Sequence, residues 1–203
     1  MSTPYQEAGR QAQKLRTYEA LIAVTRDRVA AGEAPTVDQA AALAGVARST
    51  AYRYFPGQHE LLAAAHPETA RSSMLPENPP EDPASRLDAV VVEFTNLIAR
   101  TEAQQRTMLR LSLEPRDPHD PPLPLRQGRA IAWIGEALEP LRGKLSDAQL
   151  RALTLAIRSA IGIEALVWLT DIGGLSQEEA ASSMRWHAQS LLEMAVRTPP
   201  PAS

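Results

Sequence analysis

Arginine and hydroxyl side chains dominate one short run of the chain, Arg48-Ser49-Thr50-Ala51-Tyr52-Arg53-Tyr54. A guanidinium group can donate two hydrogen bonds to a guanine edge, and hydroxyl groups can bond to phosphate oxygens. Seven residues make about two turns of helix. A purely structural helix of that length would bury more of its surface, so the run is interpreted as a candidate DNA-reading helix.

The sequence contains few of the motifs that are typical of enzymes or metal sites. The chain has no cysteine, which excludes disulfides, thiolate metal sites and cysteine nucleophiles. It also lacks Gly-x-Ser-x-Gly, a glycine-rich phosphate loop and His-Glu-x-x-His. The four histidines are scattered, at His59, His66, His119 and His187. Asp117-Pro118-His119-Asp120 offers metal-type ligands, but in a proline loop without partners at helical spacing. We expect no enzyme, no metal and no cofactor.

The polar run lies in a series of predicted helices. A first helix is predicted over residues 10–31, where apolar residues recur at three- and four-residue steps. Residues 36–39 read as a capping box that starts a short helix, and Gly45 permits the tight turn after it. A second short helix follows at about 47–54, and a fourth helix at about 57–65. Two short helices joined by a glycine turn form a helix-turn-helix, whose second helix can enter the roughly 12 Å wide major groove.

The same residues resemble the signature of the TetR (tetracycline-repressor) family. The matching segments are Thr36-Val37-Asp38-Gln39-Ala40-Ala41, the run from Ala44-Gly45-Val46 to Tyr54-Phe55-Pro56, and Glu60-Leu61-Leu62. The resemblance covers roughly the first 65 residues. It implies an all-helical homodimeric transcription regulator, usually a repressor. In that family a variable carboxy-terminal domain binds a small molecule and releases the DNA.

The resemblance also assigns roles to individual residues. It places Arg48, Ser49 and Tyr52 at or beside the bases, and Thr36, Thr50 and Tyr54 near phosphates. Arg53 completes the predicted DNA-binding set, although it could instead be a solvated charge, and Tyr52 could instead pack between helices. Val37, Ala40, Ala41, Val46, Ala51, Phe55 and Leu61 are predicted to form the core.

Three positions depart from the family pattern. Ala47 stands where a helix-capping Ser is common, Gln58 where a phosphate-contacting Lys is common, and Asp27 and Arg28 near a usual apolar pair. Each lost phosphate contact is expected to flatten the salt dependence of DNA binding by about one unit of slope. On the first helix, Arg10, Lys14 and Arg16 meet no acidic residue until Glu19.

The remainder of the chain predicts a second helical domain. Proline clusters at 76–83, 115–124 and 199–201 punctuate it, because proline ends helices. Helices are predicted at about 84–102, 102–113, 126–141, 146–171 and 176–196, and no strand is needed. The predicted fold is therefore all-α, with a helix-turn-helix domain at 1–65 and a ligand-binding and dimerisation bundle at 66–203. Residues 146–171 and 176–196 are expected to form the dimer interface.

A ligand pocket in such a bundle should be mostly apolar with a few polar groups. The candidate residues are Phe94, Met108, Arg110, Trp133, Glu164 and Trp168. Glu164 lies on an apolar helix, so it needs a partner if buried: a ligand, Arg110, or Arg158 across a dimer interface. It could equally lie at the exposed edge of the helix. The two tryptophans could instead be core residues.

Composition is that of an ordinary globular protein, with 44% hydrophobic and 22% charged residues and a net charge of −3. The polar first 14 residues and the short apolar stretch at 161–169, which Glu164 interrupts, predict a soluble cytoplasmic protein without a membrane span. The sequence thus favours a ligand-responsive homodimeric regulator of a near-palindromic operator. A helical small-molecule carrier and a protein-interaction bundle, both without sequence-specific DNA binding, remain the alternatives.

Overall fold

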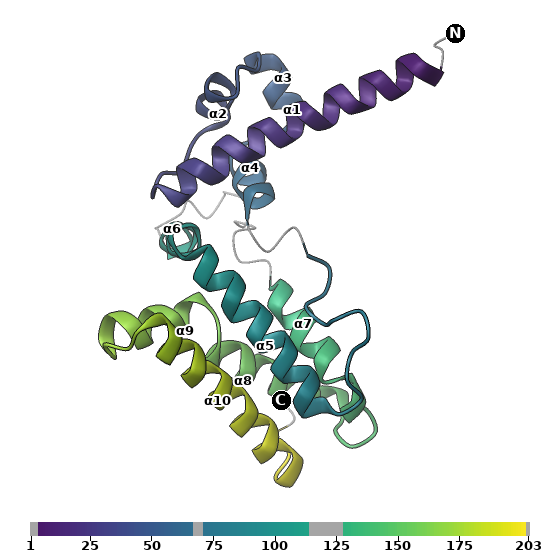
Figure 1. Ribbon diagram of the computed structural model, residues 1–203, viewed down its shortest axis with the longest axis vertical. Coiled ribbons are helices and arrows are strands. Elements are labelled where there is room, and N and C mark those ends of the chain that lie inside the picture. Colours follow the sequence, from purple (N-terminus) through teal and green to yellow (C-terminus); the bar gives the residue numbers. More distant parts are fainter. Residues whose placement is uncertain (1–3, 67–70, 114–127, 202–203) are drawn as a thin grey trace. The chain divides into compact units, whose positions relative to one another are not determined.

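The computed structural model describes residues 4–66, 71–113 and 128–201, and the regular elements in these ranges are all helical (Figure 1). This confirms the all-α prediction. Residue contacts group the helices into two compact units. One unit contains α1 to α4 together with α6, and the other contains α5 and α7 to α10. The predicted boundary at residue 65 assigned α6 to the second domain, whereas its contacts group it with the first. The possible metal ligands at 117–120 lie outside the described residues.

The first unit follows the predicted helix-turn-helix order. Its helices are α1 (Pro4–Ala30), α2 (Val37–Leu43), α3 (Arg48–Tyr54), α4 (Gln58–Ala65) and α6 (Glu102–Leu113). The predicted capping box is present, because the Thr36 hydroxyl accepts from the Gln39 amide at 3.2 Å and the Gln39 side chain accepts from the Thr36 amide at 2.8 Å. Gly45 has a φ of 65°, the left-handed conformation expected for the turn between α2 and α3.

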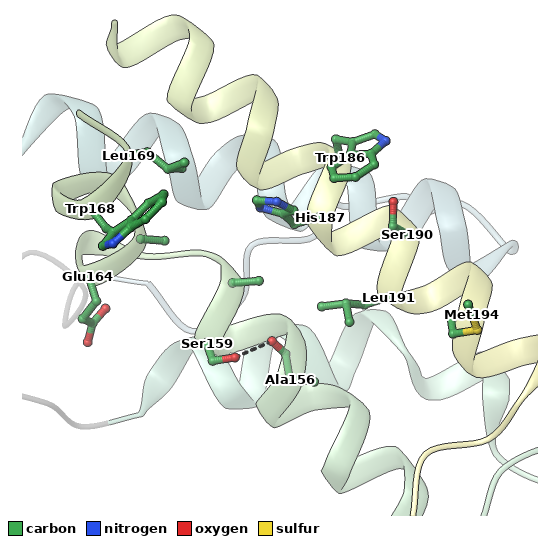
Figure 2. Close-up of a pocket in the computed structure, with 12 residues that line it drawn as sticks. Ala156, Ser159, Glu164, Trp168, Leu169, Trp186, His187, Ser190, Leu191 and Met194 are labelled. Atoms are coloured by element: carbon green, nitrogen blue, oxygen red, sulfur yellow. Dashed lines mark hydrogen bonds between the residues drawn. The ribbon is translucent and has the colours of Figure 1, made fainter. Parts of the chain in front are cut away.

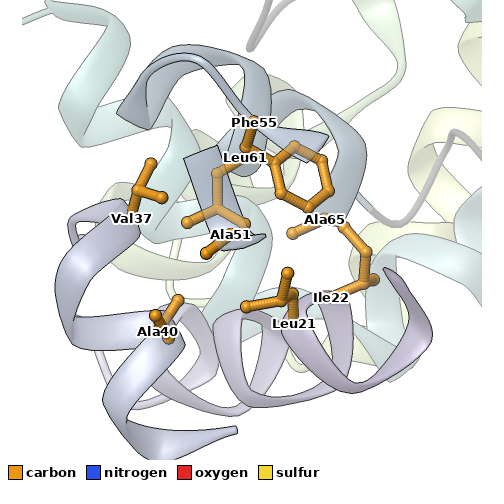
Figure 3. Close-up of a cluster of buried hydrophobic side chains, with 9 residues drawn as sticks. Leu21, Ile22, Val37, Ala40, Ala51, Phe55, Leu61 and Ala65 are labelled. Carbon is orange, nitrogen blue, oxygen red and sulfur yellow. The ribbon is translucent and has the colours of Figure 1, made fainter. Parts of the chain in front are cut away.

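A compact apolar cluster holds α1 to α4 together (Figure 3). Its buried members are Leu21, Ile22, Val37, Ala40, Ala41, Ala51, Phe55, Leu61 and Ala65. Alanine at the contact positions of α2 and α3 lets the two short helices approach closely. The predicted core residues are buried here except Val46, which is partly buried against the cluster. A second cluster of Val29, Leu62 and Met108 packs α6 onto α1 and α4.

The second unit is a bundle in which α10 packs against α5 and α8, and α7 packs against the same two helices. Its elements are α5 (Pro83–Arg100), α7 (Arg129–Ala137), a 3₁₀ turn η2 (Glu139–Leu141), α8 (Asp147–Ala160), α9 (Ile163–Val167), a π-helical turn η3 (Trp168–Ile172) and α10 (Gln177–Arg197). An ion pair between Arg185 and Asp88 joins α10 to α5. Ser146 and Ser176 begin α8 and α10 with capping boxes.

Two predicted helices of this unit are interrupted. The helix predicted at 126–141 ends at Ala137 and continues as the 3₁₀ turn, which contains Pro140. The helix predicted at 146–171 breaks after Ala160, where Gly162 adopts a φ of 123°. A side chain at Gly162 would also collide with the guanidinium of Arg158. The backbone therefore needs glycine at this break.

One segment, Asp147–Ile172, is long and apolar enough to span a membrane when judged by length and composition alone. The break at Gly162 divides this segment into α8 and a shorter helical part. Each part is shorter than the roughly 20 residues that a membrane helix needs. The apolar residues of the segment are instead shared between the core of the second unit and an exposed face described below.

Candidate nucleic-acid interface

Helix α3 is anchored on one side and exposed on the other. Ala51 and the following Phe55 are buried in the core cluster, whereas Arg48, Ser49, Tyr52 and Arg53 are exposed. At about 100° per residue, these four exposed side chains occupy one continuous arc of the helix surface. Thr50 and Tyr54 are half-buried and lie at the margin of this arc. Core packing thus aims the hydrogen-bonding side chains of α3 away from the protein.

Arg48 is oriented by two neighbouring side chains. Its Nε atom lies 2.8 Å from a carboxylate oxygen of Asp38 on α2, and its guanidinium carbon lies 5.7 Å from the centre of the Tyr52 ring. The contact with Asp38 is an ion pair without hydrogen-bond alignment. The Arg48 side chain nevertheless remains 73% exposed, so solvent screens the pair and its contribution to stability is small. The two partners restrict where the guanidinium fork can point.

The departures from the family pattern have visible structural results. Helix α3 begins at Ala47 without a side-chain cap. The side-chain amide of Gln58 donates to the carbonyl of Ala34 at 2.7 Å and so fastens the start of α4 to the segment before α2. Arg28 pairs with Glu33 at 3.2 Å just beyond the end of α1. The polar side chains at 28 and 58 thus serve local structure.

A groove lined by polar and charged residue types lies between α3 and α1, and sequence reasoning missed its α1 side. The groove has a volume of about 400 Å³ and is lined by Gln13, Lys14, Thr17, Thr50, Arg53 and Tyr54. The sequence does contain the signal, because Gln13, Lys14 and Thr17 recur at one- and three-residue steps on one face of a helix. Nothing in the sequence showed which neighbour that face meets.

The six predicted ligand-binding residues are divided between the two units. Phe94 and Trp133 are buried in the second unit with ring centres 5.9 Å apart, and the Trp133 indole donates to the Ser72 carbonyl at 3.1 Å. Met108 belongs to the small core cluster of the first unit. Arg110, also in the first unit, donates to the Gly32 carbonyl at 3.2 Å. These four residues make contacts typical of structural positions.

Glu164 pairs with Arg158 of the same chain at 3.2 Å, so the pairing needs neither Arg110 nor a second subunit. Arg158 also donates to the Ile161 carbonyl at 2.8 Å and lies 5.8 Å from the centre of the Phe94 ring. The guanidinium therefore bonds to both sides of the break at Gly162. It satisfies a carbonyl at the end of α8 and a carboxylate in the first turn of α9.

Glu164 and Trp168 line a hollow between α8, α10 and the turn that follows α9 (Figure 2). The hollow has a volume of about 780 Å³. Trp168 is 61% exposed and so is not a core residue, and Trp186 across the hollow is 66% exposed. The remaining lining residues are Ala156, Ser159, Ala160, Ala165, Leu169, His187, Ser190, Leu191 and Met194. Trp186, Ser190 and Met194 recur at four-residue steps, a signal that the sequence analysis missed.

Comparison with solved structures identifies the fold. No protein-family model and no curated protein matches the chain. A crystal structure of a TetR transcriptional regulator from Rhodococcus sp. RHA1 superposes with a TM-score of 0.58 and 23% sequence identity. The match covers 92% of this chain and 98% of that chain. The chain therefore has a TetR-like, all-α fold.

Proposed function

We propose that this protein is a DNA-binding transcription regulator that reads its site with α3. The observation that carries the proposal is the orientation of that helix. Ala51 and Phe55 anchor α3 in the core, while Arg48, Ser49, Tyr52 and Arg53 remain exposed. A two-turn helix that presents donors on its exposed arc is suited to the major groove.

Arg48 is proposed as the main base-reading residue, with Ser49 and Tyr52 beside it. Its guanidinium can donate two hydrogen bonds to the O6 and N7 atoms of guanine. Asp38 and Tyr52 restrict the arginine before binding, which reduces the entropy lost when it meets a base. Asp38 would have to share or release the guanidinium on binding, so the net gain depends on the geometry of the complex.

Phosphate contacts are proposed for hydroxyl groups at one margin of α3 and at the start of α2. Thr50 and Tyr54 lie on one margin, and Thr36 precedes α2. The Thr36 hydroxyl oxygen accepts a hydrogen bond from the Gln39 amide, and its own proton can still be donated to a phosphate. Contacts of this kind fix the register of the protein on the duplex without reading its sequence.

The functional unit is proposed to be a homodimer formed through α8, α9 and α10. Trp168, Trp186 and Met194 expose large apolar side chains around the hollow of this face. A second copy that covers the face in a two-fold arrangement would bury these side chains in both subunits. It would also present two copies of α3 to the DNA, which requires a near-palindromic operator.

Release of the DNA by a small-molecule effector, and repression as the direction of regulation, remain predictions from the family resemblance. An effector can shift the regulator between two states only by binding one of them more tightly. An effector is therefore expected to lower the affinity of the protein for its operator by some factor. The operator should lower the affinity for the effector by the same factor.

The experiment that tests the proposal uses a duplex recovered by the wild-type protein from a random pool. The double variant Arg48→Ala/Tyr52→Ala is expected to lose preference for this duplex over a scrambled one while it retains the helical circular dichroism of the wild type. The matched control, Arg100→Ala, removes one exposed arginine outside α3 and should keep the preference. A double variant that binds as the wild type does would contradict reading by α3. If the wild type itself recovers no preferred duplex, the carrier or interaction-bundle alternative takes precedence.

A further inference from the structure

We infer that the groove between α1 and α3 is a phosphate-binding site for the DNA backbone, with Lys14 of α1 as its principal cation. The inference rests on the proposed function and extends it to a helix outside the helix-turn-helix. Both helices belong to the first unit, so the groove lies within one compact body.

The charge of the groove favours an anion. Two of its lining residues, Lys14 and Arg53, are cationic, and none of the residues that line it is acidic. Lys14 belongs to α1 and Arg53 to α3, and both positive side chains line the same groove. Such an arrangement is unfavourable by itself and becomes favourable when an anion lies between the two cations.

Hydrogen-bond donors complete the site. Thr50 and Tyr54 supply hydroxyl groups from α3. The amide oxygen of Gln13 accepts from Arg16 at 2.9 Å, so the amide nitrogen is the part of Gln13 that can donate to an anion. The Thr17 hydroxyl donates to the Gln13 carbonyl at 3.0 Å and therefore forms part of the wall rather than a ligand. The volume of about 400 Å³ is many times the roughly 30 Å³ of a water molecule.

The location of the groove identifies the anion as a phosphodiester of bound DNA. Arg53 lies both on the exposed arc of α3 and in the groove. A duplex whose bases meet Arg48 and Tyr52 would therefore bring a backbone strand to Arg53 and on to Lys14. The Tyr18 ring lies 5.3 Å from Phe55 and 6.3 Å from Tyr54, measured between ring centres, which fixes α1 beside the end of α3.

The test measures the affinity of the full-length protein for a short duplex of random sequence as a function of salt. Lys14→Ala is expected to make the negative slope of log K against log salt less steep by about one unit, because one phosphate contact is lost. The ratio of wild-type to variant affinity should then fall about fourfold between 50 and 200 mM salt. Lys14 is exposed, so the variant should fold normally.

Lys144→Ala is the matched control, because it removes one exposed lysine of the second unit at a residue that does not line the groove. It is expected to change the slope much less than Lys14→Ala does. Equal slopes for wild type and Lys14→Ala, or equal losses of slope for Lys14→Ala and Lys144→Ala, would overturn this inference but not the proposed function. A wild-type protein without salt-dependent DNA affinity would overturn the proposed function and the inference with it.

Discussion

At the scale of single residues, the Arg48 guanidinium is held by the carboxylate of Asp38 on α2 and by the ring of Tyr52. The exposure of Arg48, Ser49, Tyr52 and Arg53 could be predicted from the sequence, because the polar character of this run conflicts with a purely structural helix. The ion pair between Arg48 and Asp38 could not be predicted from the sequence, because it depends on the angle between α2 and α3. The same holds for Lys14, whose neighbour across the groove is 39 positions away in the sequence, at Arg53.

Replacement of Arg48 by lysine tests whether its forked geometry matters or only its charge. Lysine keeps the positive charge but cannot form the bidentate contact with guanine. Arg48→Lys is expected to weaken binding to the selected duplex by about 1–3 kcal/mol, or roughly 5- to 150-fold. Binding to random duplex should change little. Titration of both duplexes by fluorescence anisotropy measures the two effects.

An equal loss on both duplexes would instead assign Arg48 to the phosphate backbone. The isosteric variant Asp38→Asn separates the role of the ion pair, since it leaves Arg48 intact while removing the charge that holds it. This variant is expected to change specific affinity by less than Arg48→Lys does.

At the scale of helices, start and stop signals predicted most boundaries to within a few residues. Capping boxes at Thr36, Ser146 and Ser176 begin three helices where they were expected. The break at Gly162 was missed because the glycine lies inside an apolar stretch whose periodicity continues on both sides. The helix breaks here because of tertiary contacts. Arg158 donates to the Ile161 carbonyl and to Glu164, and it lies over the ring of Phe94.

The uncapped start of α3 leads to a prediction on stability. Ala47 has φ and ψ of −60° and 136°, in the extended region that Thr36 and Ser176 adopt at their caps. Ala47→Ser should therefore accept a hydrogen bond from an amide of the first turn and stabilise α3 by about 0.5–2 kcal/mol. Hydrogen exchange of the α3 amides, followed by mass spectrometry, is expected to slow.

Ala42→Ser provides the control for this substitution, because residue 42 is an exposed position inside α2 rather than a cap. Serine is slightly less favourable than alanine there, so exchange should stay the same or become faster. If both serines slow exchange equally, the effect does not arise from capping.

At the scale of the whole molecule, the sequence predicted the all-α fold but not where the six candidate ligand-binding residues lie in it. Phe94, Met108, Arg110, Trp133, Glu164 and Trp168 were grouped by residue type. The structure distributes them over two cores, a helix-end contact and an exposed hollow. Which apolar residues face a core and which face outward depends on contacts between distant segments. The spacing of apolar residues along a helix does not show which other segment that helix contacts.

The exposed tryptophans lead to a prediction on assembly. An interface-forming tryptophan contributes about 150–250 Å² of buried surface, and a carboxylate in its place would be desolvated without a partner. Trp186→Glu is therefore expected to convert a dimer into a monomer at micromolar concentration, as measured by light scattering. Leu15→Glu, an equivalent change at an exposed position of α1, should leave the dimer intact. A Trp186→Glu protein that remains dimeric would exclude this face as the interface.

The central claim, that α3 of a two-fold dimer reads DNA, is tested most directly by selection from a random duplex pool with the purified protein. The stoichiometry of the enriched complex is then measured. The account predicts enrichment of a near-palindromic sequence bound by one or two dimers, with half-sites a whole number of helical turns apart. A folded protein that enriches no sequence and shows no salt-dependent affinity for DNA would contradict it.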